Sequence, residues 1–157
     1  MEMKKFVSTK TYQSLGPVAY RQWRAESHCN LIHGYALSFH FEFEAEDLDA
    51  RNWVVDFGSL APLKGLLEDW FDHTLLCAED DPLRDEFQRL QDLGLAKITW
   101  VERTGCEGLA DFLYEYMNDC WMKDYGYAGR VWCSKVEVRE HEKNSAMRIG
   151  HRPEKSE

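Results

Sequence analysis

The stretch Tyr35-Ala36-Leu37-Ser38-Phe39-His40-Phe41-Glu42-Phe43-Glu44-Ala45 alternates between apolar and polar side chains. Successive side chains of a β-strand point to opposite faces, so Leu37 and the three phenylalanines share one face. Ser38, His40 and the two glutamates share the other. This alternation predicts a half-buried strand over residues 35–45.

The segment before this strand is expected to pair with it. Val18–His28 can form a neighbouring strand, since only Cys29–Ile32 separate the two segments. A connection of this length is typical of a β-hairpin. We therefore expect residues 29–32 to form the turn of a short hairpin.

Apolar residues further along the chain recur at helical spacing. They predict helices over residues 59–71 and 82–93. A third helix is expected to begin near Thr104, which forms a capping-box pattern with Glu107, and its apolar stripe continues to Trp121.

Two further strands are expected, a brief one over residues 97–101 and one over residues 132–140. The whole order of elements predicts an α+β fold, with one antiparallel sheet and helices on one of its faces.

Length and composition narrow the class of protein. With 157 residues and 44% hydrophobic composition, we expect a single domain over residues 1–157. The net charge of -9 disfavours binding to nucleic acid. The sequence has no signal-like start and no apolar stretch approaching the ~20 residues that cross a bilayer, which predicts a cytoplasmic protein without a membrane partner. Five cysteines without a C-x-x-C pair argue against a disulfide scaffold.

The densest cluster of chemically useful residues runs from His28 to Tyr35. If residues 29–32 form the turn, His28 and His33 lie opposite each other and Tyr35 shares the face of His33. Two imidazoles placed in this way suit Zn²⁺. The alternative is that the histidines only form hydrogen bonds in a turn. Cys29 lies beside them, where a cation or metal would stabilise a thiolate for proton transfer, or it is a small apolar residue.

Three other positions are candidates for a site. Asp72 and His73 are adjacent, and a carboxylate that orients an imidazole tunes a general acid or base; such pairs also cap helix ends. Glu140 shares the apolar face of its strand with the preceding valines. Its carboxylate therefore needs a partner, such as a ligand with two neighbouring N–H donors, unless it lies beyond the last buried residue.

These segments together resemble the 6-pyruvoyl-tetrahydropterin synthase and 6-carboxytetrahydropterin synthase family over about residues 18–146. The matching motifs occur in the family's order, as Trp23-Arg24-Ala25-Glu26-Ser27-His28, Cys29-Asn30-Leu31-Ile32-His33-Gly34-Tyr35, Val54-Val55-Asp56-Phe57, Phe71-Asp72-His73, Thr104-Gly105-Cys106-Glu107 and Val136-Glu137-Val138-Arg139-Glu140.

The resemblance implies the T-fold (tunnelling fold), whose subunits assemble into rings, often hexamers, with active sites between subunits. It also assigns roles to the residues of this chain. Glu140 would anchor the pterin ring, with Thr104 and Glu107 also at the substrate. The proton transfers would fall to Cys29, Asp72 and His73. Zn²⁺ would be the cofactor, with His28, His33 and Tyr35 at the ligand positions. Tyr35 replaces the family's third histidine, and His28 directly precedes Cys29.

The short Cys-x-x-x-His spacing resembles the 6-carboxytetrahydropterin synthase branch. The sequence therefore predicts a lyase that converts 7,8-dihydroneopterin triphosphate to a reduced pterin in 7-deazaguanine and queuosine synthesis. Two alternatives stay open. One is a pterin aldolase or epimerase, and the other is a non-catalytic, ring-forming subunit that binds pterin. All three readings predict a small-molecule pterin partner and a homo-oligomer.

Overall fold

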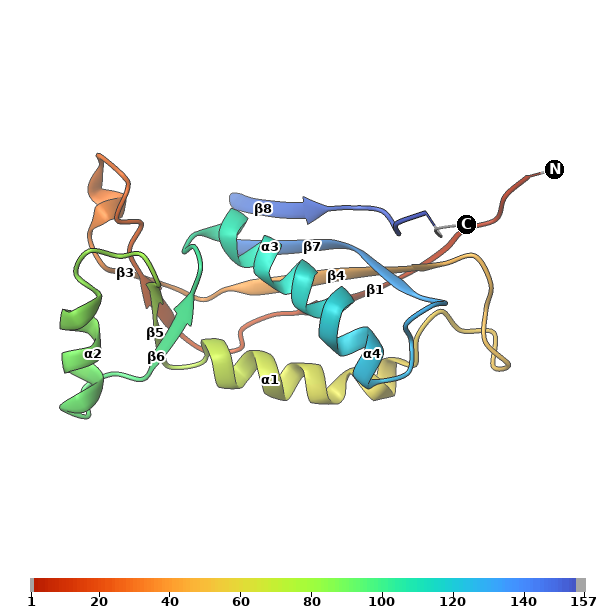
Figure 1. Ribbon diagram of the computed structural model, residues 1–157, viewed down its shortest axis with the longest axis horizontal. Helices are drawn as coiled ribbons and strands as arrows, with labels where there is room; N and C mark the ends of the chain where they lie inside the picture. Colours follow the sequence, from red (N-terminus) through yellow and green to blue (C-terminus); the bar gives the residue numbers. More distant parts are fainter. Residues whose placement is uncertain (1, 155–157) are drawn as a thin grey trace.

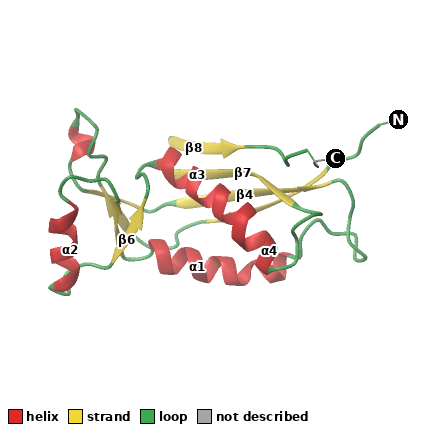
Figure 2. Ribbon diagram, viewed as in Figure 1, coloured by secondary structure: helices red, strands yellow, loops and turns green. Residues whose placement is uncertain are grey.

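The computed structural model describes residues 2–154 and contains two four-stranded sheets (Figures 1 and 2). The larger sheet has the order β1-β4-β7-β8 and is antiparallel throughout. The smaller sheet has the order β3-β2-β5-β6. Its first pair is antiparallel and the other two are parallel. The strands are β1 (Phe6–Tyr12), β2 (Val18–Tyr20), β3 (His33–Tyr35), β4 (Ser38–Ala45), β5 (Thr74–Ala78), β6 (Ile98–Val101), β7 (Trp132–His141) and β8 (Asn144–Ile149).

Helices α1 and α3 run along the larger sheet, and α2 lies with the smaller sheet at one end of the elongated molecule (Figure 1). Within the described residues, no helix is long and apolar enough to span a bilayer. The helical segments are η1 (His28–Asn30), η2 (Phe57–Leu60), α1 (Ala61–Phe71), α2 (Arg84–Asp92), α3 (Cys106–Tyr116), the π-helical turn η3 (Met117–Trp121) and α4 (Met122–Asp124).

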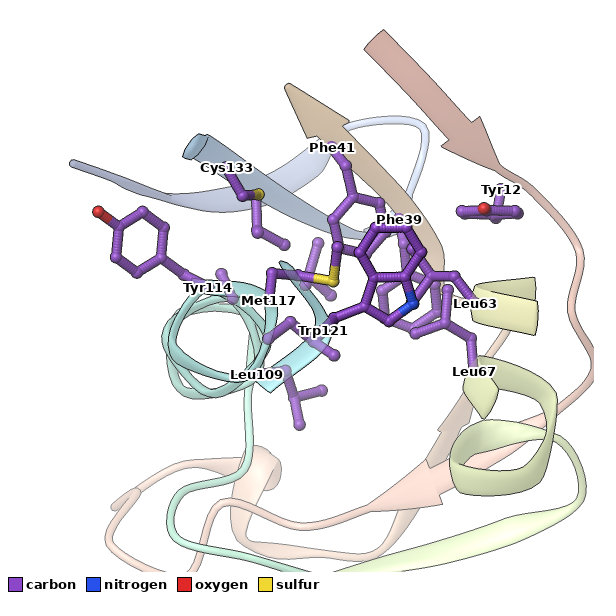
Figure 3. Close-up of a cluster of buried hydrophobic side chains, with 14 of the residues drawn as sticks. Tyr12, Phe39, Phe41, Leu63, Leu67, Leu109, Tyr114, Met117, Trp121 and Cys133 are labelled. Carbon is purple, nitrogen blue, oxygen red and sulfur yellow. The ribbon is translucent and has the colours of Figure 1, made fainter. Parts of the chain in front are cut away.

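The alternation of β4 organises the core, as its sequence predicts. Phe39, Phe41 and Phe43 are fully buried, whereas the polar residues between them are only half-buried. Figure 3 shows Phe39 and Phe41 on the side of the sheet that faces Leu63 and Leu67 of α1 and Met117 and Trp121 of η3, which continues α3. Phe39 also lies against Phe71 at the end of α1, with ring centroids 4.9 Å apart. The expected α+β fold with helices on one face of an antiparallel sheet is confirmed.

The expected hairpin is wrong in its extent. β2 ends at Tyr20, and Tyr20 pairs with His33, so residues 21–32 form a long loop instead of a four-residue turn. The longer strand β4 does not continue this pairing. Its neighbours in the larger sheet are β1 and β7.

The smaller sheet and three strands were not expected from the sequence. β1 and β8 are the outer strands of the larger sheet and bury few side chains, so their apolar pattern is weak. β5 is a short apolar run directly after α1 and can be read equally well as part of that helix. Its pairing with β2 and β6 is parallel, which corrects the expectation of a single antiparallel sheet.

A buried asparagine stabilises a β-bulge in the middle of the larger sheet. Lys135 pairs with Glu42 and Cys133 pairs with Phe43, so Ser134 is an extra residue in β7. The Asn118 side chain, on the π-helical turn, accepts a hydrogen bond from the Cys133 N–H at 2.9 Å. Its amide also donates to the Cys133 carbonyl at 2.8 Å. One side chain therefore satisfies both main-chain groups of a buried residue beside the bulge.

We predict that Asn118→Ala lowers the free energy of unfolding by about 2–4 kcal/mol, because two buried main-chain groups lose their partner. Urea unfolding measures this loss. Asp119→Ala, at the exposed neighbouring position, serves as the control and should change the free energy by no more than about 0.5 kcal/mol. Equal stability of the two variants would contradict the assigned role of Asn118.

Candidate functional site

A polar cavity of about 470 Å³ lies where β7 ends and α3 begins. Glu140 is in its wall and is 16% exposed. The Asn144 amide donates a hydrogen bond of 3.1 Å to the Glu140 carboxylate. The cavity is lined by Gln22, Cys106, Glu107, Glu140, Lys143, Asn144 and Ser145.

The Glu140 carboxylate has neutral neighbours in Tyr35 and Cys106, but the His141 imidazole also lies 3.6 Å from it and Lys143 lines the same cavity. Burial, followed by the charge of Glu140 and a hydrogen bond with it, raises the pKa of the Tyr35 phenol to about 12. Burial, followed by the charges of Glu140 and Glu107, raises the pKa of the Cys106 thiol to about 12. Both groups are therefore protonated at neutral pH. Glu140 and Glu107 are the carboxylates that line the cavity.

The Tyr20 hydroxyl lies behind this cluster. It is fully buried and makes no hydrogen bond of ordinary geometry within the described residues. Its close neighbour is the Cys106 thiol, a weak hydrogen-bonding partner. Burial above all, and then the nearby Cys106, Tyr35 and Glu140, raise the pKa of Tyr20. Tyr20 is therefore a neutral, buried aromatic residue behind the cavity and not part of its lining.

The start of α3 corrects the expected capping box. The N-cap is Gly105, with a φ of 95°, and no side chain caps the helix. Thr104 instead donates a hydrogen bond of 2.7 Å to the Arg21 carbonyl. Glu107 is therefore free of a capping role and lines the cavity of Glu140. Thr104 lies in an adjoining cavity of about 150 Å³, which shares Gln22 with the first.

The structure confirms only part of the arrangement expected for residues 28–35. His33 and Tyr35 share one face of β3, with ring centroids 4.9 Å apart, as their spacing predicts. His28, however, is exposed on η1, and Tyr20 occupies the position opposite His33. The expected pairing of His28 with His33 is wrong, because residues 21–32 form a loop instead of a tight turn. Cys29 follows His28 and lies near enough to Tyr35 to influence its phenol electrostatically.

These residues do not fit a zinc ion as one ligand set. The described part of the chain contains no cluster of three or more His, Cys, Asp or Glu side chains suited to a metal. Tyr35 would have to ligate as a phenolate, and its raised pKa opposes that. His33 retains one ligand feature, because its Nδ1 lies 2.5 Å from the Leu31 carbonyl. A proton on Nδ1 leaves the Nε2 lone pair free.

Asp72 and His73 form a separate dyad at the start of β5. Their carboxylate and imidazole are 2.5 Å apart, and the His73 side chain is 79% exposed. The corner is tight, because a Cβ on Gly16 would lie 1.7 Å from the Asp72 carboxylate. None of the hydrogen bonds or ion pairs among residues 2–154 joins this dyad to Cys29 or Glu140. Neither Asp72 nor His73 is among the residues that line the cavity of Glu140 in a single chain.

Sequence reasoning missed five residues that line the cavity, Gln22, Cys106, Lys143, Asn144 and Ser145. Cys106 had a usable signal, since it lies between Thr104 and Glu107. The other four had none, because each reaches the cavity from a segment without a recognisable pattern. A different cavity, of about 370 Å³, contains none of the expected site residues and lies beside Lys4, Trp132 and His151.

Comparison with known proteins agrees with this architecture. No curated protein sequence matches the chain significantly. An uncharacterized protein from Wolinella succinogenes has a similar structure, with a TM-score of 0.78, 21% identity, and coverage of 94% of this chain and 99% of that chain. The 6-pyruvoyl tetrahydropterin synthase of Caenorhabditis elegans is also similar, with a TM-score of 0.62, 17% identity, and coverage of 96% of this chain and 99% of that chain. A catalytic-residue mutant of the Plasmodium vivax 6-pyruvoyltetrahydropterin synthase has a TM-score of 0.61 and 12% identity, and the match covers 90% of this chain and 96% of that chain.

These structural similarities show that the chain has the T-fold. The family itself is shown by a comparison of sequences. The model of the 6-pyruvoyl tetrahydropterin synthase family matches residues 17–150, which is most of the chain and includes every residue of the cavity and of the dyad. The chain therefore belongs to the 6-pyruvoyl tetrahydropterin synthase family.

Proposed function

We propose that this chain is a 6-carboxytetrahydropterin synthase-like lyase that acts on 7,8-dihydroneopterin triphosphate in the cytoplasm, for 7-deazaguanine and queuosine synthesis. Membership of a family of pterin-metabolising lyases supports the coarser part of this proposal. The observation that carries it is the Glu140 carboxylate in the wall of a polar cavity.

Glu140 suits the recognition of a pterin ring. A pterin presents a ring N–H beside an exocyclic amino group, and one carboxylate accepts hydrogen bonds from both. Tyr35 and Cys106 are neutral donors beside Glu140, so neither neutralises its charge. Glu107 lines the same cavity, and Thr104 stands at the adjoining one, where the substrate side chain would begin.

Proton transfer is assigned to Cys29 and to the Asp72–His73 dyad. The Cys29 carbonyl accepts a hydrogen bond of 2.9 Å from the Gln22 N–H, and Gln22 lines the Glu140 cavity, so Cys29 belongs to the Glu140 end of the site. The Asp72 carboxylate holds the His73 imidazole in one orientation, so that it can give or take a proton at its other nitrogen. Since neither residue of the dyad lines the Glu140 cavity in one chain, we propose that a complete site uses the dyad of a second copy.

The larger sheet provides surfaces for such an assembly. β1 and β8 are its outer strands, and exposed edges tend to be covered or paired. Val7 on β1 and Met147 and Ile149 on β8 are exposed apolar residues on these strands. A ring of several copies, with hexamers as the family expectation, would pair these edges.

A non-catalytic, ring-forming, pterin-binding subunit is the second candidate. The replacement of a family histidine by Tyr35 favours it, and so does the exposed position of His28 on η1, outside the strand that carries His33 and Tyr35. Pterin affinity would then be retained without turnover.

The first prediction concerns pterin binding. Glu140→Gln should weaken the binding of a dihydropterin by about 1.5–3 kcal/mol, the range for hydrogen bonds to a charged group. Titration calorimetry measures this change. Glu115→Gln is the matched control, because Glu115 is an exposed glutamate on α3 that does not line the cavity. Equal affinities of the two variants would refute the role of Glu140.

The second prediction concerns the shared site. Cys29→Ser and Asp72→Asn should each be inactive alone. Mixed at equal amounts under conditions that exchange subunits, they should recover about a quarter of wild-type turnover, since each half of a shared site has an even chance of being intact. A mixture that stays inactive despite exchange, or a sedimenting species of only 18.5 kDa, would exclude a site built from two copies.

The third prediction concerns zinc. Tyr35→His should raise the zinc that the purified protein retains, because it places a second imidazole beside His33. Elemental analysis after dialysis measures this content. Tyr35→Phe removes the phenol without adding a ligand and is the control. If both variants retain the same amount of zinc, position 35 does not belong to a metal site.

A further inference from the structure

A buried ion pair fixes the loop that carries Cys29. Arg21 follows β2 directly, and its guanidinium donates two hydrogen bonds to the Asp81 carboxylate, at 2.9 and 2.7 Å. The side chains are only 13% and 1% exposed. Burial by itself raises the pKa of Asp81, but the hydrogen bonds from Arg21 and from the Leu83 N–H outweigh it and lower that pKa. The carboxylate is therefore charged and fully paired.

The same guanidinium also holds the far side of the loop. Arg21 Nη1 donates to the Asn30 side-chain oxygen at 3.0 Å. The Asn30 amide in turn donates to the carbonyls of Trp23, at 2.8 Å, and Ala25, at 3.3 Å. The planar guanidinium of Arg21 therefore links Asn30, in the same loop, to Asp81, in the segment that follows β5. A lysine has no planar group and cannot make these contacts together.

Cys29 lies inside this network. Its carbonyl accepts a hydrogen bond from the Gln22 N–H at 2.9 Å, and its neighbour Asn30 is bound to Arg21. The Arg21 carbonyl also accepts from Thr104 at 2.7 Å, which ties the loop to the residue that precedes the N-cap of α3. The position of Cys29 relative to the Glu140 cavity therefore depends on contacts made by Arg21.

We propose that Arg21 is a positioning residue that, through Asp81 and Asn30, holds the Cys29 thiol in place beside the Glu140 cavity. The catalytic value of holding Cys29 in place rests on the proposed function. That Arg21 restrains Cys29 does not depend on it. An adjacent pair in the chain, Arg24 and Asp80, provides a natural contrast. Their hydrogen bond is 2.9 Å long, but the side chains are 73% and 50% exposed.

The test compares Arg21→Lys with the matched control Arg24→Lys, both in a Cys120→Ser background. Cys120 is exposed and the three other cysteines besides Cys29 are buried, so iodoacetamide then reports on Cys29. Arg21→Lys should speed the alkylation of Cys29 by about tenfold, because the loop opens more readily without the three-way contact. Arg24→Lys should leave the rate unchanged. Equal rates in the two variants would overturn the proposal.

Turnover separates positioning from mere stability. Arg21→Lys should lower kcat by about tenfold or more and leave KM within about twofold, since Glu140 stays in place while the thiol is displaced. An unchanged kcat would overturn the positioning role. If the wild-type protein shows no turnover, the proposed function fails, and the alkylation contrast still decides whether Arg21 restrains Cys29.

Cys133, which is fully buried in the core, reports on global unfolding. If Arg21→Lys speeds the alkylation of both Cys29 and Cys133, Asn30→Ala takes its place. This variant removes the side-chain contacts of Asn30 with Arg21, Trp23 and Ala25 and leaves the buried Arg21–Asp81 ion pair intact. Faster alkylation of Cys29 alone in this variant supports the proposal. An unchanged rate at Cys29 overturns it.

Discussion

The two-faced character of β4 is the constraint on which the rest of the structure depends. Phe39, Phe41 and Phe43 lose all contact with water, and each such burial is worth about 1.5–3 kcal/mol. This stabilisation requires that helices cover one face of the sheet. Helix α1 and the continuous helical segment of α3 and η3 cover that face (Figure 3). Because α3 packs along β7 and begins at Cys106, its first turn lies beside the last residues of that strand. The cavity around Glu140 is a consequence of this packing.

Local patterns could predict much of this arrangement. The spacing of Val136, Val138 and Glu140 placed a carboxylate on the apolar face of its strand, and it does line a cavity. Similarly, the alternation in β3 placed His33 and Tyr35 on one face. Both inferences use only neighbouring residues of one element, where the geometry of the backbone fixes the answer.

The failures concern contacts between distant parts of the chain. Thr104 had a local partner in Glu107 but bonds instead to Arg21, 83 residues away. The loop over residues 21–32 could not be foreseen for the same reason, since the Arg21–Asp81 pair that holds it joins segments 60 residues apart. The outer strands β1 and β8 bury few side chains and so leave little periodicity to detect.

The central claim is that the Glu140 carboxylate in its polar cavity, the restrained Cys29 thiol and the Asp72–His73 dyad together process a pterin. The most direct measurement incubates the purified protein with 7,8-dihydroneopterin triphosphate and identifies the products by chromatography and mass spectrometry. The account predicts loss of the triphosphate and a two-carbon shortening of the side chain, which gives a 6-carboxy pterin. Recovery of unchanged substrate from a protein that binds it would contradict the catalytic claim and leave a pterin-binding subunit as the better description.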